Sequence, residues 1–311
     1  MTTKGIDVSK HQGTIDFGKV KASGYDFVII RAGYGRSITQ MDERFEQNYR
    51  AAKAAGLDVG AYWYSYAKSE AEAVQEAKVF LQAVKGKQFE YPLYMDVEEA
   101  GQFRLGKSAV SRLICAFLHE LEQNGYWAGL YMSTHYLTNF VDESIRKRYA
   151  IWVAQYSSAC SYKGEYGIWQ YGIAGNSKWD TQKVHAVNGI AGECDLDYSY
   201  VDYPSLIRAA GRNGFPKTSS KSVDELAREV IDGKWGNGDD RKARLNQAGY
   251  DYNAVQTKVN ELVGAKSTDE LAREVAAGKW GNGDARRKAL TAAGYDYKAV
   301  QEKVNQMLKQ Q

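Results

Sequence analysis

Eight short apolar runs, separated by amphipathic stretches, occupy the first two thirds of this 311-residue chain. Each run has the length and the β-branched and aromatic content of a buried strand. The runs cover residues 5–9, 26–33, 58–66, 92–98, 127–133, 149–156, 166–172 and 193–199. Helical periodicity lies between the early ones, at 42–55, 69–84 and 107–124. Eight strands that alternate with helices predict a closed parallel α/β barrel.

The second half of this barrel is expected to be irregular. Too little sequence separates the last apolar runs to form full helices between them. The predicted fold class is therefore α/β, an irregular TIM-like (β/α) barrel formed by residues 1–210.

A change of composition ends the barrel region. The polar, Gly-, Ser- and Pro-bearing segment GRNGFPKTSSK at 211–221 predicts a linker. After it, residues 222–262 recur at 267–307 with 28 of 41 positions identical. Internal repetition of this kind predicts two copies of one structural unit, at 222–263 and 267–308.

Each repeat is expected to form a small bundle of three short helices. Ser222 and Ser267 open the first helix, with a glutamate three residues later that completes a capping box. Asp239 and Asp284 suit the N-cap of the second helix, and Asp251 and Asp296 that of the third.

Duplication of a unit of about 40 residues serves multivalent binding more often than catalysis. The GKWGNG turn would expose its tryptophan, and the arginine after the turn could bind a carboxylate bidentately or form a surface salt bridge. The candidate ligand-binding residues are Trp235, Asn237, Arg241 and Tyr250, with their counterparts Trp280, Asn282, Arg286 and Tyr295.

The segment YMDVE at 94–98 ends in two acidic residues of one strand face. Successive strand side chains alternate, so Asp96 and Glu98 point the same way, about 6.6 Å apart along the chain. Like charges at that spacing raise one pKa, which keeps one carboxylic acid protonated beside an ionised one. A solvated strand end is the alternative interpretation.

Polar residues also close most of the other predicted strands. The active site of a parallel barrel lies at the carboxyl ends of its strands. The candidates at these ends are Asp7, Arg31, Tyr62, Tyr64, Asp96, Glu98, Tyr131, Gln155, Gln170 and Asp195. For any single Gln or Tyr among them, a hydrogen-bonded rim residue is the competing explanation.

Charge, hydropathy and cysteine usage narrow the functional classes. The net charge is only +3 and no basic stripe is present, so nucleic-acid binding is not expected. No run is long and apolar enough to cross a membrane, and a predicted strand follows Lys4 too closely for a signal peptide, which favours synthesis in the cytoplasm. Three cysteines without metal-ligand spacing predict free thiols, with a Cys160–Cys194 bridge as the alternative, and no metal or cofactor is expected.

Six segments carry a resemblance to glycoside hydrolase family 25, the muramidases typified by Chalaropsis-type and phage lysozymes. They are GIDVSKHQGTIDFGKVKASGYDFVIIRAGYG at 5–35, GAYWYSYA at 60–67, YPLYMDVE at 91–98, IWVAQY at 151–156, IWQYG at 168–172 and DLD at 195–197. The tail resembles the type-seven cell-wall-binding repeats of some phage lysozymes. The two resemblances together cover nearly the whole chain.

This resemblance implies a barrel with about five helices that hydrolyses the β-1,4 bond between N-acetylmuramic acid and N-acetylglucosamine in bacterial peptidoglycan. It implies that Glu98 is the proton donor, with Asp96, Asp7 and Asp195 as further catalytic acids. Asp197 competes with Asp195 for the last of these positions. The substrate-binding set is Arg31, Tyr62, Tyr64, Tyr131, Trp152, Gln155, Trp169, Gln170 and Asp197.

Two mechanisms fit these acids. Either a carboxylate attacks or activates water, or the 2-acetamido oxygen of the substrate attacks while Asp96 stabilises the resulting ring. The acetamido route, which retains configuration, is favoured because both carboxylates lie on one strand and hence on one side of the bond. We expect a monomeric enzyme whose partner is peptidoglycan, a phage endolysin for host lysis, with a bacterial autolysin as the alternative origin. The alternatives are a chitinase-like glycosidase and an inactive wall-binding lectin.

Overall fold

The chain divides into two compact units, Met1–Thr218 and Ser219–Gln311, each of which is described by itself. The computed structural model describes residues 2–216, 221–248, 250–263, 266–293 and 295–308. Residues 217–220 of the predicted linker lie outside the described part of the chain.

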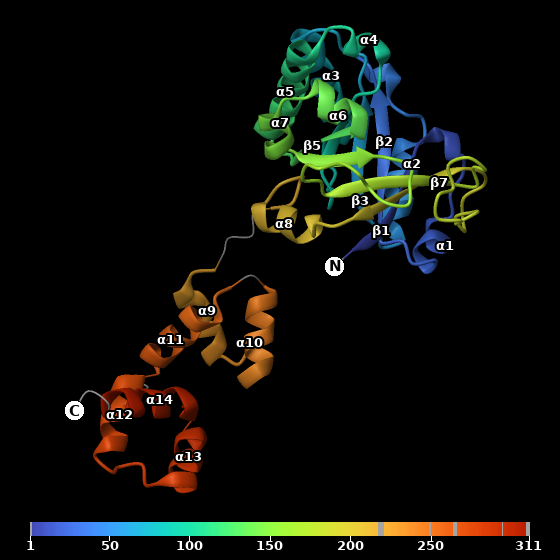
Figure 1. The fold of residues 1–311 in the computed structure, drawn as a ribbon. Helices are drawn as coiled ribbons and strands as arrows, with labels where there is room; N and C mark the ends of the chain where they lie inside the picture. Colours follow the sequence, from blue (N-terminus) through green and yellow to red (C-terminus); the bar gives the residue numbers. More distant parts are fainter. Residues whose placement is uncertain (1, 217–220, 249, 264–265, 294, 309–311) are drawn as a thin grey trace. The chain divides into compact units, whose positions relative to one another are not determined.

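The first unit is built around a closed barrel of eight strands in sequential order (Figure 1). All eight predicted strands are present: β1 Thr3–Val8, β2 Phe27–Tyr34, β3 Asp58–Tyr64, β4 Leu93–Asp96, β5 Ala128–Ser133, β6 Ala150–Ala154, β7 Ile168–Ala174 and β8 Cys194–Ser199. Apolar runs of strand length, without helical periodicity, were therefore sufficient to locate the sheet.

The expectation of an all-parallel barrel is wrong for the last strand. β8 runs antiparallel to both of its neighbours, β7 and β1. Residues 175–193, which connect β7 to β8, contain no helix. A parallel strand would need a crossover from one end of the sheet to the other, whereas an antiparallel strand can start at the end where β7 stops. Residues at the start of β8 therefore lie at the same barrel end as the carboxyl ends of β1–β7.

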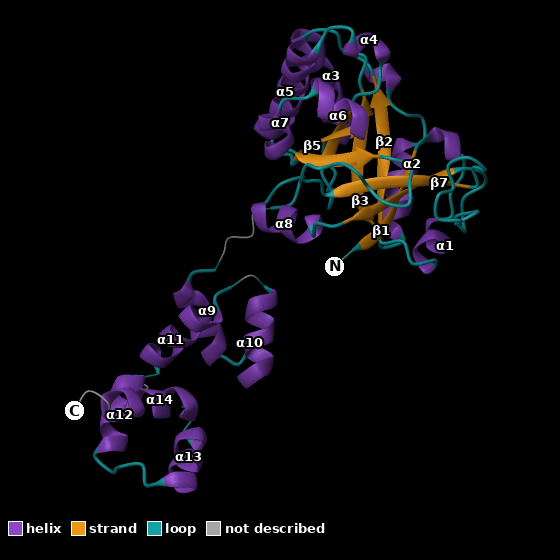
Figure 2. Ribbon diagram, in the orientation of Figure 1, coloured by secondary structure: helices purple, strands orange, loops and turns teal. Residues whose placement is uncertain are grey.

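Helices lie outside the sheet (Figure 2). The three predicted helices are confirmed as α2 Phe45–Ala54, α3 Glu70–Val84 and α5 Lys107–Gln123. Five shorter helices were not predicted: α1 Phe17–Ala22, α4 Ala100–Phe103, α6 Thr134–Phe140, α7 Glu143–Arg148 and α8 Tyr203–Ala210. The 3-10 turns are η1 Lys10–Gln12 and η2 Ile38–Gln40. No helix separates β6, β7 and β8, as the short connections predicted.

Strand alternation gives the barrel two apolar layers. Phe27, Ile29, Tyr94 and Trp152 belong to an interior cluster, whereas the residues between them pack outward beneath the helices. Gly129 of β5 makes room for one interior ring, since a Cβ there would lie 2.4 Å from the Tyr94 ring. The interior is thus filled with aromatic side chains, and polar groups are left for the ends of the barrel.

Residues 211–215, at the start of the predicted linker, pack against the end of the barrel where β4 and β5 begin, which we call the foot. The Asn213 side chain is fully buried, accepts a 2.6 Å hydrogen bond from Trp127 N and donates one of 2.8 Å to Tyr91 O. Its backbone bonds Phe89 and Gly125. This segment therefore contributes to the first unit and is not a free tether.

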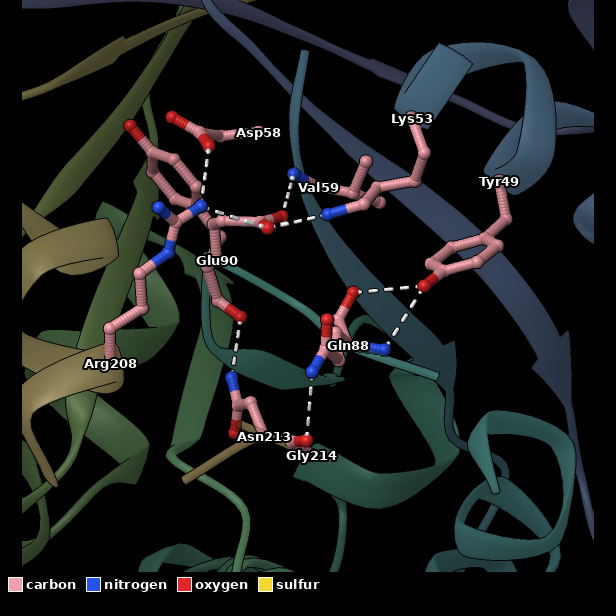
Figure 3. Close-up of polar contacts among 10 residues, drawn as sticks. Tyr49, Lys53, Asp58, Val59, Gln88, Glu90, Arg208, Asn213 and Gly214 are labelled. Atoms are coloured by element: carbon pink, nitrogen blue, oxygen red, sulfur yellow. Dashed lines mark hydrogen bonds and ion pairs between the residues drawn. The ribbon is translucent and has the colours of Figure 1, made fainter. Parts of the chain in front are cut away.

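An ion-pair cluster accompanies Asn213 at the foot (Figure 3). The buried Glu90 carboxylate accepts hydrogen bonds from Lys53 Nζ at 2.5 Å, Val59 N at 3.1 Å and Arg208 Nη2 at 3.1 Å. Arg208 comes from α8 and Lys53 from α2. The cluster thus joins the last helix of the unit to the sheet and to an early helix.

The second unit contains the two predicted three-helix repeats. They comprise α9 Val223–Ile231, α10 Gly238–Gln247 and α11 Tyr252–Leu262, then α12 Thr268–Ala276, α13 Gly283–Ala292 and α14 Tyr297–Leu308. Both predicted capping boxes are formed. The N-caps of α10 and α13 are Asn237 and Asn282; the predicted Asp239 and Asp284 lie instead in the first turn, where the helix dipole favours negative charge.

Candidate active site

Five carboxyl-bearing residues come from the same end of the barrel. Asp7 lies near the end of β1, Asp96 ends β4, and Glu98 follows two residues later. Asp195 and Asp197 come from β8, and the antiparallel register pairs Asp195 directly with Asp7. The reversed direction of β8 thus brings its early residues to the carboxyl end of β1.

Asp96 and Glu98 differ in their exposure to solvent. Asp96 is 4% exposed, and its Oδ1 atom has no hydrogen-bond partner among the described residues. Glu98 is exposed, so a substrate can reach it. Loss of surrounding water raises the pKa of both carboxyls, because Asp96 is buried and protein groups crowd the Glu98 carboxyl although its side chain still reaches solvent; the Glu99 charge raises the pKa of Glu98 further. The pair therefore holds a proton more readily than free carboxylates do, and Glu98 is its exposed member.

Asp7 and Asp197 are buried beside one another and are fixed by polar side chains. Gln170 donates a 2.7 Å hydrogen bond to Asp7 Oδ2 and accepts one of 2.8 Å from the Tyr131 hydroxyl. The Trp152 indole donates a 2.7 Å hydrogen bond to Asp197 Oδ1. Burial, followed by the Asp195 charge, raises the pKa of Asp7, and burial raises that of Asp197. Asp7 and Asp197 thus lie in the buried part of the carboxyl cluster.

Asp195 is less buried than these two residues. Burial and the Glu98 charge raise its pKa to about 6, while a hydrogen bond from Tyr156 opposes the increase. Tyr156 was not among the predicted site residues. Strand alternation identifies it only once the structure has shown Trp152 to be interior, because residues 152, 154 and 156 share a face.

Arg31, Tyr62 and Tyr64 border the acids from β2 and β3. Arg31 donates a 2.8 Å hydrogen bond from Nε to the buried Asp42, and its charge opposes the raised pKa of Asp96. Burial and then the Asp7 charge raise the pKa of Tyr62. Tyr64 donates a 2.9 Å hydrogen bond to Glu99. The Arg31 guanidinium and the phenols of Tyr62 and Tyr64 thus border the acids. Asp42, which binds Arg31, and Glu99, which accepts the Tyr64 hydrogen bond, were not among the residues predicted from the sequence.

Three predicted substrate-binding residues do not border the acids in the way that Arg31, Tyr62 and Tyr64 do. Gln155 accepts hydrogen bonds from Thr134 and Ser161, on the opposite strand face from Trp152. Trp169 belongs to the outer layer, and its indole donates to Gln155 O at 2.9 Å. Trp152 is 1% exposed and lies beneath Asp197. Alternation explains the difference: Gln170 points inward, so its neighbour Trp169 points outward.

All three cysteines are free, and Cys194 is fully buried. Within the described ranges, no three His, Cys, Asp or Glu side chains are arranged to hold a metal ion. None of the described helices is long and apolar enough to cross a membrane.

In each repeat, the candidate ligand-binding residues make contacts within the repeat itself. The Trp235 indole donates a 3.0 Å hydrogen bond to Glu229 and packs edge-on against Tyr250. Arg241 donates to Gly236 O, Gln256 Oε1 and Asn237 Oδ1. The second repeat reproduces these contacts with Trp280, Tyr295, Arg286 and Asn282. The arginines therefore brace the glycine turn, and neither forms the predicted surface salt bridge within the described residues.

Comparison with known protein families decides the classification of the barrel. The model of the glycosyl hydrolases family 25 matches residues 6–178, which is more than half of the chain. The chain belongs to the glycosyl hydrolases family 25. The CW_7 repeat matches residues 224–263 and 269–308. The predicted family and the predicted type of repeat are both confirmed.

Curated family-25 relatives include bacterial and phage proteins. The autolytic lysozyme of Clostridium acetobutylicum is 31% identical over 197 residues, which cover 62% of this chain and 55% of the relative. The lysozyme of Streptococcus phage Cp-7 is 29% identical over 273 residues, covering 83% of this chain and 69% of the relative. The chain thus spans little more than half the length of the clostridial protein.

Solved structures share the barrel. The modular autolysin LytC from Streptococcus pneumoniae matches with a TM-score of 0.55 and 26% identity, over 64% of this chain and 47% of that one. The CTP1L endolysin matches with a TM-score of 0.55 and 24% identity, over 67% of this chain and 70% of that one. The latter likeness concerns the fold alone.

Proposed function

We propose that this family-25 protein is an N-acetylmuramidase, which hydrolyses the β-1,4 bond between N-acetylmuramic acid and N-acetylglucosamine in bacterial peptidoglycan. One observation carries the proposal: the exposed Glu98 is paired with the buried Asp96 at the mouth of the barrel. Glycoside hydrolysis needs a protonated acid for the leaving oxygen and a second group that stabilises the oxocarbenium-like transition state. This pair supplies both.

Glu98 is the proposed proton donor. Its raised pKa keeps a larger fraction protonated as the pH approaches neutrality, and its exposure lets it approach the glycosidic oxygen. Asp7 and Asp195 are proposed to contribute to the same electrostatic environment, since the Glu98 charge raises the pKa of Asp195 and the Asp195 charge raises that of Asp7.

Asp96 is proposed to orient the 2-acetamido group of the substrate, whose oxygen attacks the anomeric carbon with retention of configuration. The unpartnered Oδ1 atom of Asp96 supports this role, because it is an acceptor that no described residue uses; since it is buried, neighbouring side chains must move slightly for the acetamido N–H to reach it. Arg31 would favour the ionised form of Asp96 that accepts this hydrogen bond.

The proposal is tested by digestion of defined peptidoglycan and mass spectrometry of the products. New reducing ends on N-acetylmuramic acid are expected, with initial release of the β-anomer in proton NMR spectra. Cleavage of chitin in preference to peptidoglycan would instead indicate a chitinase-like enzyme. Glu98→Gln keeps the shape but removes the donor proton, so lysis should fall by at least about tenfold. No loss of wall turbidity with the unmodified protein would indicate a binding protein without activity.

The two CW_7 repeats are proposed to retain the enzyme on the cell wall as a monomer. The phage lysozyme, which shares 29% identity over 83% of this chain, supports a role as an endolysin in host lysis. The proposed ligand of the repeats is the glycan-peptide unit of peptidoglycan.

A further inference from the structure

Tyrosine side chains form a continuous line from the acids to the outer rim of the barrel. The Tyr64 and Tyr66 ring centroids lie 5.1 Å apart, and those of Tyr66 and Tyr34 lie 6.1 Å apart. Tyr64 is half-buried, whereas Tyr66 and Tyr34 are 46% and 37% exposed. We call these last two residues the rim tyrosines.

The inner end of this line contacts the proposed catalytic segment. The Tyr64 hydroxyl donates a 2.9 Å hydrogen bond to Glu99, the residue after Glu98. Tyr34 ends β2, and Tyr66 follows β3 by two residues; both strands lie between β1 and β4, which carry Asp7 and Asp96. The rim tyrosines therefore continue the surface on which the acids lie.

Backbone hydrogen bonds hold the two tyrosine-bearing segments together. Gly35 N donates to Tyr64 O at 3.1 Å, and the Trp63 indole donates to Gly35 O at 2.9 Å. These bonds link the residue after Tyr34 to the end of β3. Because the segments are already joined, little conformational entropy remains to be lost when a ligand binds there.

A buried carboxylate of α3 holds the Tyr66 segment in place by hydrogen bonds. Glu76 of α3 is fully buried and accepts hydrogen bonds from Tyr66 N at 2.9 Å and from the Ser65 hydroxyl at 2.6 Å. Gln102 of α4 donates to the same hydroxyl and to Ala67 O. This segment is thus bonded to α3 and to the short helix that follows Glu98 and Glu99.

The chemistry of the exposed surface suits an uncharged sugar. Aromatic faces bind the C–H face of a pyranose ring by apolar contact. The nearby Arg36 is paired with Glu72, and its backbone N–H is bonded by Gln40, so its charge is already compensated within the protein. The Arg36 charge is therefore not free to attract a peptide carboxylate.

We propose that Tyr34 and Tyr66 form a distal subsite that binds an N-acetylhexosamine residue of the glycan strand, beyond the two sugars that flank the cleaved bond. The proposal rests on the proposed muramidase function and adds a dependence on chain length. A long glycan reaches the rim tyrosines while its scissile bond lies at Glu98. A short glycan that occupies only the catalytic positions does not reach them.

The test compares peptide-free glycan strands of two lengths, a tetrasaccharide and strands of eight or more sugars, with the full chain. Tyr34→Ala/Tyr66→Ala should lower kcat/KM on the long strands by about tenfold and change it on the tetrasaccharide by less than about twofold. Replacement of both residues by Phe should preserve the rate, because the rings remain. Tyr200→Ala is the matched control: Tyr200 is 41% exposed but follows Ser199, which pairs with Thr3 at the opposite barrel end.

Equal losses on short and long strands, or no loss on either, would overturn the subsite. A loss that requires stem peptides on the strand would assign the rim tyrosines to peptide binding instead. Calorimetric binding of long strands to Glu98→Gln, with and without the double Ala substitution, tests the subsite independently of cleavage. Glu98→Gln with and without the double Ala substitution contains the same repeats. Equal affinities of these two proteins for long strands would therefore overturn the subsite. If the unmodified protein cleaves neither glycan nor peptidoglycan but the affinity difference is found, the proposed function fails and the subsite stands.

Discussion

At the residue scale, the barrel mouth is dominated by carboxyl groups that the fold removes from water. Burial is the first cause of the raised pKa of Asp7, Asp96, Glu98 and Asp197. Most of these residues lack a strong cationic partner, so their charged forms are disfavoured. The site therefore retains protons at a pH where free carboxyls lose them, which suits acid catalysis.

The charge of Glu99 gives a direct test of how the donor is tuned. Glu99→Gln removes a negative charge that raises the pKa of Glu98, while the amide oxygen can still accept the Tyr64 hydrogen bond. Glu98 should then lose its proton at lower pH. The alkaline limb of the kcat/KM profile is expected to move to lower pH by up to about one unit. A limb that stays in place or moves to higher pH would contradict this.

The buried carboxyl of Asp197 should lower the free energy of unfolding at neutral pH. A carboxyl whose pKa is raised by folding gives its full stability below the pKa of the unfolded chain and loses it as the pH rises through the folded value. Asp197→Asn keeps an acceptor for Trp152 and removes the buried charge. It should raise the free energy of unfolding by ~1–2 kcal/mol at pH 7 and by less at pH 4. Thermal unfolding at the two pH values measures this, and an equal change at both would be inconsistent with it.

At the element scale, the direction of β8 decides which residues meet. The sequence identified Asp195 as an acid near the end of a parallel strand, but it is the second residue of an antiparallel one. Both arrangements bring it to the barrel mouth. The strand alternation that placed Asp96 and Glu98 on one face also accounts for the misplaced Trp169 and the missed Tyr156. Alternation is readable from sequence only after one residue of each strand has been assigned to the interior.

The segment after α8 should stabilise the whole barrel. Asn213→Ala leaves Trp127 N and Tyr91 O buried without their partners, which should lower the free energy of unfolding by ~2–4 kcal/mol. The φ angle of Asn213 is 56°, which alanine tolerates poorly and glycine readily. Asn213→Gly should therefore be less destabilising than the alanine variant. Denaturant unfolding measures both, and a loss below ~0.5 kcal/mol for both would show that this segment does not secure the barrel.

At the scale of the whole molecule, one family-25 barrel, proposed to be catalytic, is combined with two CW_7 repeats, proposed to bind the wall. Two repeats on one chain increase retention on a polymer through effective concentration, without any new contact. Deletion of residues 265–311 should therefore weaken retention on cell walls by more than about tenfold, but binding of a single soluble muropeptide by about twofold at most. Sedimentation with walls and calorimetry with the muropeptide measure the two effects. Equal losses in both assays would show that the repeats do not act together.

The sequence alone determined the eight strands, the three longest helices of the barrel, the family and the repeat, because these depend on local patterns: apolar runs, helical periodicity, capping boxes and motif spacing. Asp96 and Glu98 were predicted together because they lie two residues apart in one predicted strand, although β4 ends at Asp96 and Glu98 follows it. Only the tertiary structure decided the direction of β8, the inward or outward orientation of Tyr156 and Trp169, and the packing of Asn213 under the barrel. These features depend on contacts between residues far apart in sequence, such as Asp7 with Asp195 and Asn213 with Trp127. Barrel closure and burial select such contacts, and no local pattern encodes them.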